Sequence, residues 1–447
     1  LSPAVELPDG WSTEAESRMD GAWWASFPDP ALPELLDEAL ANNWNLAAAG
    51  ARLEAAAAEA KIAGADVWPA LNLTGNAARQ EQVLTFLKDP VTGAPLKNVS
   101  NSFGVSLGVS WELDLWGRVR NGKSAAAADL QAATADYAAA RQSIAAQTMK
   151  AWFAALEAQE QAALAQETVA SFERTVERIR SRYERGLQPS LDVRLGLVDL
   201  ADARTVAAAR QVARDRAVRQ LEILLGRYPA GRLEAAGSLP DPPADVPAGL
   251  PAELLSRRPD LVAAERRLAA SLRRNASARR ALLPRLTLTG SAGRSSSELG
   301  DLLAGDFSVW SIAGGLLQPI FQGGRLRAQV SRSGALADAA LATWANSVLT
   351  ACAEIETLLA SESFLRVQET EQRIRAEEAA AAHAQARRRY ERGLTDVNTL
   401  LSSQRSAAQA RSAWLDARRQ RLDARVDLHL ALGGDFGEAR PSGGSAS

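Results

Sequence analysis

The chain has 447 residues and a formal net charge of −2, with 51 Lys and Arg against 53 Asp and Glu, a balance that does not favour a nucleic-acid partner. Hydrophobic residues make up 47% of the chain but aromatic residues only 5%, and the abundance of Ala, Leu, Glu and Arg is typical of long helices. No run of about eighteen apolar residues occurs, so the sequence predicts no transmembrane helix.

The first segments alternate between irregular and regular structure. Residues 1–30 are rich in Pro, Gly and Trp and predict an N-terminal arm packed on a larger body. Residues 31–66 have a helical pattern that Pro69 ends. A weak strand is expected at about 70–79, followed by a loop over 80–102 that contains Pro and Gly.

A second strand, at about 103–115, has the clearest pattern in the chain. Small or acidic residues alternate without a break with large apolar ones, which is the period of a strand with one apolar face. Tilted by about 45°, thirteen residues would cross the ~30 Å core of a bilayer. The apolar residues, which we expect to face the membrane, are Phe103, Val105, Leu107, Val109, Trp111, Leu113 and Leu115.

A helix of about sixty residues follows, from Gly122 to Tyr183, and apolar residues near its end repeat every 3.5 residues. The sequence at about 184–191 breaks this helix into a hairpin tip, and Ser190 is predicted to cap a second helix that ends near residue 226. Residues 227–251 carry six prolines and predict a linker.

The same order of elements then recurs. Arg182-Tyr-Glu-Arg-Gly-Leu187 returns as Arg389-Tyr-Glu-Arg-Gly-Leu394, displaced by 207 residues. The sequence therefore predicts two repeats of helix, two strands, long helix, tip and helix, at 31–226 and 252–433. The second repeat is expected to have strands at about 285–295 and 307–321 and a tip at about 391–397, before a flexible tail over 434–447. A longer loop between the strands accounts for eight additional residues in the first repeat.

Four strands are too few to close a membrane barrel, and lipid does not tolerate open strand edges. Several copies of the chain are therefore expected to share one barrel. The polar face of the strands carries small, hydrophilic residues, which predicts a water-filled lumen. The Ala-rich helices are expected to continue the barrel as a tube.

Several motifs resemble the TolC-type outer-membrane efflux channels, in particular their NodT-like lipoprotein branch. They are Trp23-Trp24 with Phe27-Pro-Asp-Pro30, Trp111-Glu-Leu-Asp-Leu-Trp-Gly-Arg118, Leu254-Leu-Ser-Arg-Arg-Pro-Asp260, Gln318-Pro-Ile-Phe321 with Gly323-Gly-Arg325, and the two Arg-Tyr-Glu-Arg-Gly-Leu copies. The resemblance implies an α/β membrane protein of the bacterial outer membrane. It implies a homotrimer, in which a twelve-stranded transmembrane β-barrel with four strands per chain continues as a coiled-coil α-helical tunnel in the periplasm.

The implied function is the outer-membrane channel of a tripartite efflux system that passes drugs or other small toxic molecules out of the periplasm. The implied partners are a periplasmic adaptor (membrane fusion) protein, an inner-membrane pump of the resistance-nodulation-division type and outer-membrane lipid. No enzyme activity, cofactor or metal site is expected. The branch usually begins with an acylated cysteine, which this chain does not contain, so a lipid anchor that was trimmed off and one that is absent both stay open.

By resemblance, the hairpin tips meet the adaptor. The positions that match are Gly186, Leu187, Ser190 and Leu191 in the first copy and Gly393, Leu394, Thr395 and Val397 in the second. Relatives narrow the pore with an aspartate ring and a bulky residue one turn earlier, where this chain has Ser402 and Asn398, followed by Arg405. Asp192 and Arg194 are further candidates, as an ion pair between subunits or an ordinary surface pair.

Three alternatives remain at this stage. A soluble coiled-coil scaffold would fit the helices but not the alternation at 103–115. An enzyme would need a set of acid, base, nucleophile and metal ligand. The sequence shows no such set, and the chain has only two His. Within the channel class, the alternative function is the exit duct for type I protein secretion.

Overall fold

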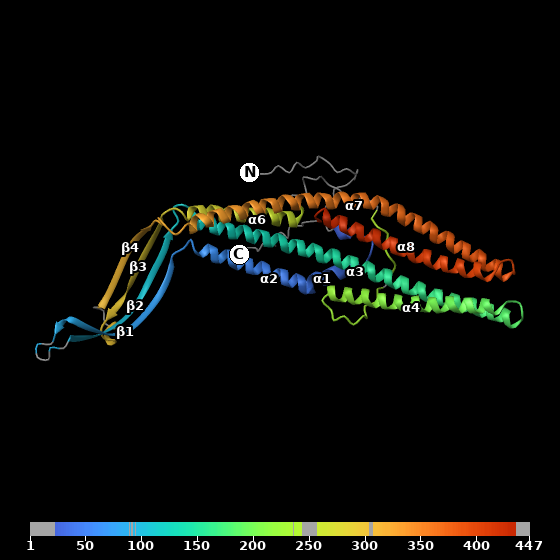
Figure 1. The fold of residues 1–447 in the computed structure, drawn as a ribbon, viewed down its shortest axis with the longest axis horizontal. Helices are drawn as coiled ribbons and strands as arrows, with labels where there is room; N and C mark the ends of the chain where they lie inside the picture. The colour runs from blue at the N-terminus through green and yellow to red at the C-terminus, as the bar shows by residue number, and fades with distance from the viewer. Residues whose placement is uncertain are drawn as a thin grey trace, which may run out of the picture. The chain divides into compact units, whose positions relative to one another are not determined.

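The computed structural model describes residues 23–88, 90, 93, 95–235, 237–243, 257–303 and 307–434. No helix in these ranges is both long and apolar enough to cross a membrane. Figure 1 shows long helices and a set of neighbouring strands. The helices are α1 (Leu32–Asn42), α2 (Trp44–Ala65), α3 (Arg118–Glu184), α4 (Ser190–Leu224), α6 (Pro259–Arg280), α7 (Arg325–Glu391) and α8 (Val397–Ala431), with short 3₁₀ turns η1 (Trp23–Ser26) and η3 (Gly300–Leu303).

The chain divides into two compact units. The helical unit contains Leu1–Arg52, Thr134–Ala263 and Ala345–Ser447, and the strand unit contains Leu53–Ala133 and Ala264–Trp344. Each unit takes residues from both halves of the chain. The compact units therefore differ from the two sequence repeats, which describe how the elements recur along the chain.

The strand unit holds one antiparallel sheet in the order β1-β2-β3-β4. Its strands are β1 (Ala70–Lys88), β2 (Pro95–Leu113), β3 (Arg285–Ser296) and β4 (Ser308–Leu317). Because each strand pairs with the next one along the chain, the sheet consists of two hairpins side by side. Among the described residues, β1 and β4 each pair on one side only and form its edges.

The first hairpin is longer than the sequence pattern indicates. Residues 80–88 and 95–102, predicted as loop, belong to β1 and β2, so the extra residues of this repeat lengthen the strands rather than the loop. This stretch mixes polar residues with the apolar run at 83–87 and lacks a clear alternation, but the two strands pair from Gln80 to Leu84 and again at Lys88.

Two strand ends also differ from the prediction. Strand β2 ends at Leu113, so Leu115 lies beyond it and belongs to the turn that leads into α3. Strand β4 ends at Leu317, because Pro319 has no backbone N–H to continue a ladder.

In the helical unit, α3 with α4 and α7 with α8 form two hairpins. One core buries Trp23 and Phe27 against Phe153 and Leu156 of α3 and Val426 of α8. A second core lies near the tips and joins both hairpins. It contains Phe172, Val176, Ile179, Leu200, Ala203, Tyr390, Val397, Leu400 and Leu401.

Both hairpins turn at a glycine in the left-handed region. Gly186 and Gly393 each have a φ of 74°, where a side chain would be strained. The N–H of Leu187 binds the carbonyl of Arg182, and the N–H of Leu394 binds that of Arg389, which closes the end of each long helix. The predicted cap at Ser190 is wrong, because Ser190 is the first helical residue and Pro189, which has no side-chain donor or acceptor, holds the cap position.

Candidate functional site

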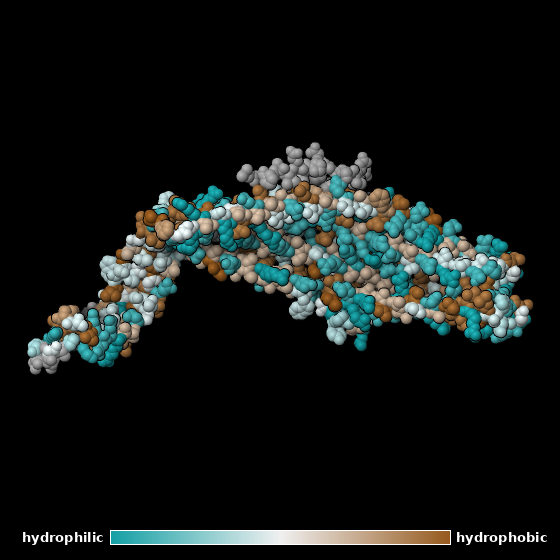
Figure 2. Space-filling model, viewed as in Figure 1, coloured by the Kyte–Doolittle hydropathy of each residue, from teal (hydrophilic) through white to brown (hydrophobic). Residues whose placement is uncertain are grey.

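The register places most large apolar residues of the four strands on one face of the sheet, although Val309 and Leu317 of β4 lie on the other. Leu73 lies opposite Leu107, Leu107 opposite Ala292, and Ala292 opposite Trp310. Large apolar side chains on this face are exposed, for example Leu73 at 74% and Trp310 at 77%. Figure 2 shows hydrophobic residues, in brown, on the surface of the strands. A solvent-facing apolar band across a whole sheet requires a cover of lipid or protein.

The opposite face carries small and polar side chains. Along β2 it presents Gly104, Ser106, Gly108, Ser110 and Glu112. Their neighbours on β1 are Asn76, Thr74, Asn72 and Ala70, and on β3 they are Ser295, Gly293, Ser291, Thr289 and Thr287. The sheet thus separates an apolar side from a hydrophilic side, which is what a wall between lipid and water needs.

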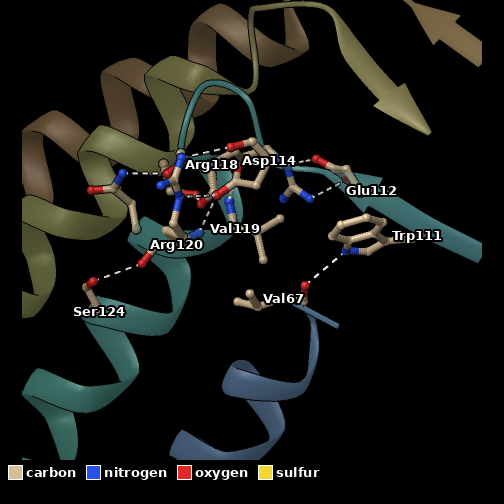
Figure 3. A network of polar contacts seen from close by, with 11 residues as sticks. Val67, Trp111, Glu112, Asp114, Arg118, Val119, Arg120 and Ser124 are labelled. Atoms are coloured by element: carbon tan, nitrogen blue, oxygen red, sulfur yellow. Dashed lines mark hydrogen bonds and ion pairs between the residues drawn. The ribbon is translucent and has the colours of Figure 1, made fainter. Parts of the chain in front are cut away.

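A polar network holds the turn from β2 into α3 (Figure 3). The guanidinium of Arg118 donates to both carboxylate oxygens of Glu112 at 2.9 and 2.8 Å. The carboxylate of Asp114 accepts the backbone N–H groups of Val119 and Arg120 at 3.0 and 2.8 Å, which caps the first turn of α3. The acidic residues at the end of the strand therefore fix the direction in which the long helix starts.

Two tryptophans fasten the same turn to neighbouring chain segments. Trp111 donates its indole N–H to the carbonyl of Val67 at 2.9 Å, just before β1, and Trp116 donates to the carbonyl of Pro284 at 2.8 Å, just before β3. Trp111 is therefore both a member of the apolar face and a connection between two strand ends.

Three of the predicted constriction residues, Asn398, Ser402 and Arg405, lie on one exposed side of α8. Asn398 and Ser402 are exposed, while Leu400 and Leu401 between them are buried in the core near the tips. The hydroxyl of Ser402 donates to the carbonyl of Thr399 in its own helix, at 3.2 Å. Both positions are free to face a pore.

Arg405 continues this exposed side, but its guanidinium reaches across to the other hairpin. Its Nη1 donates to the two carboxylate oxygens of Asp199 on α4, at 2.6 and 2.8 Å. The Asp199 side chain is only 5% exposed, whereas that of Arg405 is 50% exposed. Asp199 was not among the predicted site residues, although an acidic residue within the apolar stretch Leu197-Val-Asp-Leu200 signals a carboxylate that needs a partner.

Asp192 and Arg194 form no ion pair with each other within the described chain, so their pairing between subunits stays a prediction. Burial of its carboxyl, and then the negative charge of Asp396 in the other tip, raise the pKa of Asp192 above its ordinary value. The two tips therefore bring the carboxylates of Asp192 and Asp396 close to one another, whereas Arg178 near the first tip forms an ion pair with Glu391 at the second.

The predicted adaptor-contacting residues differ in how available they are. Leu187, Leu191 and Leu394 are each more than 60% exposed, which is unusual for leucine and suits a contact surface. Gly186, Ser190 and Gly393 are also exposed and Thr395 is half-buried. Val397 is 2% exposed and packs in the core near the tips, so its side chain is not offered to a partner.

Among the residues that the structure describes, no group of three or more His, Cys, Asp or Glu is placed to hold a metal ion.

Comparison with known proteins identifies the family. The family model for outer membrane efflux proteins matches residues 35–227 and 250–434. Outer membrane protein OprJ of Pseudomonas aeruginosa is 35% identical over 448 residues, covering 98% of this chain and 92% of that protein. The toluene efflux pump outer membrane protein TtgC of Pseudomonas putida is 31% identical, covering 97% of this chain and 90% of that protein.

A solved structure agrees with these relatives. The MtrE outer membrane channel of Neisseria gonorrhoeae superposes with a TM-score of 0.86 at 30% identity, covering 97% of each chain. The chain belongs to the outer membrane efflux protein family. The resemblance seen in the sequence, the fold class and the outer-membrane location are confirmed, and efflux is the function that the relatives support rather than protein secretion.

Proposed function

We propose that three copies of this chain form one channel that conducts drugs or other small toxic molecules from the periplasm to the exterior. The observation that carries the proposal is the two-faced sheet with its two edge strands. Lipid accepts a sheet only when every edge is paired, so β4 of one copy has to pair with β1 of the next. Three sheets of four strands close a barrel with the hydrophilic face inside.

The proposed partners follow from the relatives. OprJ is named an outer membrane protein, and TtgC is named the outer membrane protein of a toluene efflux pump. We therefore expect this chain to receive its cargo from an adaptor and a resistance-nodulation-division pump and to perform no catalysis of its own. The exposed leucines Leu187, Leu191 and Leu394 are the residues we expect the adaptor to cover.

The test combines assembly and phenotype. The mass of the protein purified in detergent should equal three chains, and deleting its gene should increase sensitivity to organic solvents or drugs. A monomer in detergent-free buffer would contradict the proposal. Unchanged drug sensitivity together with loss of a secreted protein would favour type I secretion instead.

Ser402 allows a sharper test of the constriction. A ring of three serines attracts cations less than three carboxylates do, so the wild-type channel should show weak cation preference. We predict that Ser402→Asp increases the cation-to-anion permeability ratio several-fold in planar bilayers. Thr399→Asp adds the same charge one turn back on the same helix, and its permeability ratio is compared with that of Ser402→Asp. An unchanged ratio in Ser402→Asp would show that Ser402 does not line the narrowest point.

A further inference from the structure

A groove of about 660 Å³ lies between α3, α4 and α8 in the helical unit. This volume is in the range of sites that hold drug-sized molecules. We call it the α4–α8 groove. The residues that α8 contributes to it include Arg405, Gln409, Ser412 and Asp416. They continue the spacing of Asn398 and Ser402 by steps of three or four residues, so the groove and the proposed constriction share one side of α8.

Two polar contacts span the groove from α4 to α8. One is the ion pair of Arg405 with Asp199. The other is the bond that Arg210 Nη2 donates to the hydroxyl of Ser412 at 3.0 Å. The seven steps from residue 405 to residue 412 rise about 10 Å along the helix, so the two contacts frame an opening as wide as a few fused rings.

The floor of this opening is apolar. Leu164 and Phe172 of α3, Val206 of α4 and Ala408 of α8 line it. Phe172 is 3% exposed and belongs to the core near the tips, so it does not move freely, whereas Val206 is 51% exposed. A ligand that lies here would cover exposed apolar surface without displacing a polar partner.

The groove has an excess of negative charge. Its charged lining residues are Glu157, Asp199, Asp202, Asp416, Arg210 and Arg405. Both arginines already bind the opposite wall, and Arg419, outside the lining, pairs with Glu157 and Asp416 at 4.0 and 3.6 Å. Asp202 lies between the two polar contacts, is exposed, and has no ion-pair or hydrogen-bond partner among the described residues.

A second groove, of about 590 Å³, provides an internal contrast. It lies between α3, α7 and α8, and its charged lining residues are Glu167, Glu377, Arg174, Arg373 and Arg411. Arginines outnumber carboxylates there, whereas carboxylates outnumber arginines in the α4–α8 groove. The linings on the two sides of α8 therefore differ in their ratio of carboxylates to arginines.

We propose that the α4–α8 groove binds organic monocations with an apolar body on their way through the channel. The cationic centre would face Asp202, and the apolar body would lie on Val206, Ala408 and the edge of Phe172. This inference rests on the proposed function, because it places the groove on the pore side next to the constriction. The inference adds to the proposed function the chemical class of solute that the channel itself binds.

The probe is rhodamine 6G, a fluorescent monocation with a fused-ring body, titrated against the full channel in lipid nanodiscs by fluorescence anisotropy. Asp202→Asn keeps the shape of the side chain and removes its charge, and it should raise the dissociation constant about tenfold. The control is Glu167→Gln, which neutralises an exposed carboxylate of the second groove and should leave the dissociation constant unchanged. Fluorescein, an anion of similar ring size, should bind at least ten times more weakly than rhodamine 6G.

Each outcome decides one point. Equal weakening by Asp202→Asn and Glu167→Gln, or equal binding of the two dyes, would overturn the inference. A protein that conducts ions in planar bilayers but does not bind rhodamine 6G would also overturn it and leave the proposed function standing. A protein that forms no conducting channel would overturn the proposed function itself.

Discussion

The two hairpin tips share the sequence Arg-Tyr-Glu-Arg-Gly-Leu but not the surroundings of its tyrosine. Tyr390 is 1% exposed and belongs to the core near the tips, whereas Tyr183 is 46% exposed. Arg182 of the first copy lies over the ring of Tyr390, with its Cζ 4.5 Å from the ring centre. Identical local sequence thus gives identical turns but different packing, because the first hairpin serves as a neighbour for the second.

A second pair of equivalent positions, Glu222 and His429, shows the same divergence farther along the helices. Both are buried, at 3% exposure each. The Glu222 carboxylate accepts the backbone N–H groups of Gly231, Arg232 and Leu233. His429 instead stacks on the indole of Trp23, 5.4 Å between ring centres. One repeat uses a charged acceptor where the other uses a neutral ring.

The largest expected effect concerns the tyrosines. Tyr390→Ala should lower the free energy of unfolding by about 3–5 kcal/mol, the usual loss for emptying a buried aromatic site. Tyr183→Ala should cost less than about 1 kcal/mol if no other chain covers it. Denaturant unfolding in detergent, followed by circular dichroism, measures both. An equal loss would show that a neighbouring copy buries Tyr183.

The second prediction is a pH dependence. Burial, and then the charge of Arg425, lower the pKa of His429 to about 4, against about 6.5 in an unfolded chain. The unfolded state therefore binds more protons between pH 6.5 and 4, and stability falls as the pH falls through this window. His429→Gln should remove up to about 3 kcal/mol of that loss. The measurement is the free energy of unfolding of the wild-type protein and of His429→Gln at pH 7.5, 5.5 and 4.

Two carboxylates help to interpret this dependence of the free energy of unfolding on pH. Burial raises the pKa of Asp423 to about 6, so protonation of Asp423 adds stability as the pH falls, opposite to the effect of His429. This contribution is the same in the wild-type protein and in His429→Gln. Burial alone would raise the pKa of Glu222, but three backbone N–H groups outweigh it and the pKa is lowered. The stability that Glu222 contributes is then lost only below its unfolded value of about 4.3, so Glu222→Gln should leave the slope between pH 7.5 and 5.5 unchanged.

The third prediction compares the two junctions between strand and long helix. Asp114 corresponds to Phe321 in the second repeat, and Glu112 corresponds to Pro319. Asp114→Ala should cost about 1 kcal/mol through loss of the cap on α3. Phe321 is 87% exposed, so Phe321→Ala should not destabilise a single chain. Weaker trimers of Phe321→Ala in native mass spectrometry would show that the second junction is completed by another copy.

The smallest effect is expected at the caps of the two tip helices. The Asp396 carboxylate accepts the N–H of Thr399 at 2.7 Å, whereas the α4 end has no side-chain cap. Asp396→Ala should lower the melting temperature slightly more than Ser190→Ala does. The opposite order would mean that Ser190 makes a contact in the assembled channel that it lacks here.

The pattern of residues at 103–113 was sufficient to predict β2 and its apolar face, because alternation is a property of neighbouring residues. The tips were also predictable, since glycine followed by a capping or proline residue ends a helix locally. The length of the first hairpin was not, because its outer part is held by pairing between strands and lacks a clear alternation. The role of Asp199 was missed because its partner Arg405 is 206 residues away.

The sequence by itself determined the repeat, the four strands, the long helices and the family. These depend on spacings of two to seven residues and on motifs that are continuous in the chain. Only the tertiary structure decided which tyrosine is buried, which arginine binds Asp199 and which groove carries excess carboxylates. Burial and ion pairing depend on side chains that different helices bring together, and two nearly identical segments can meet different neighbours.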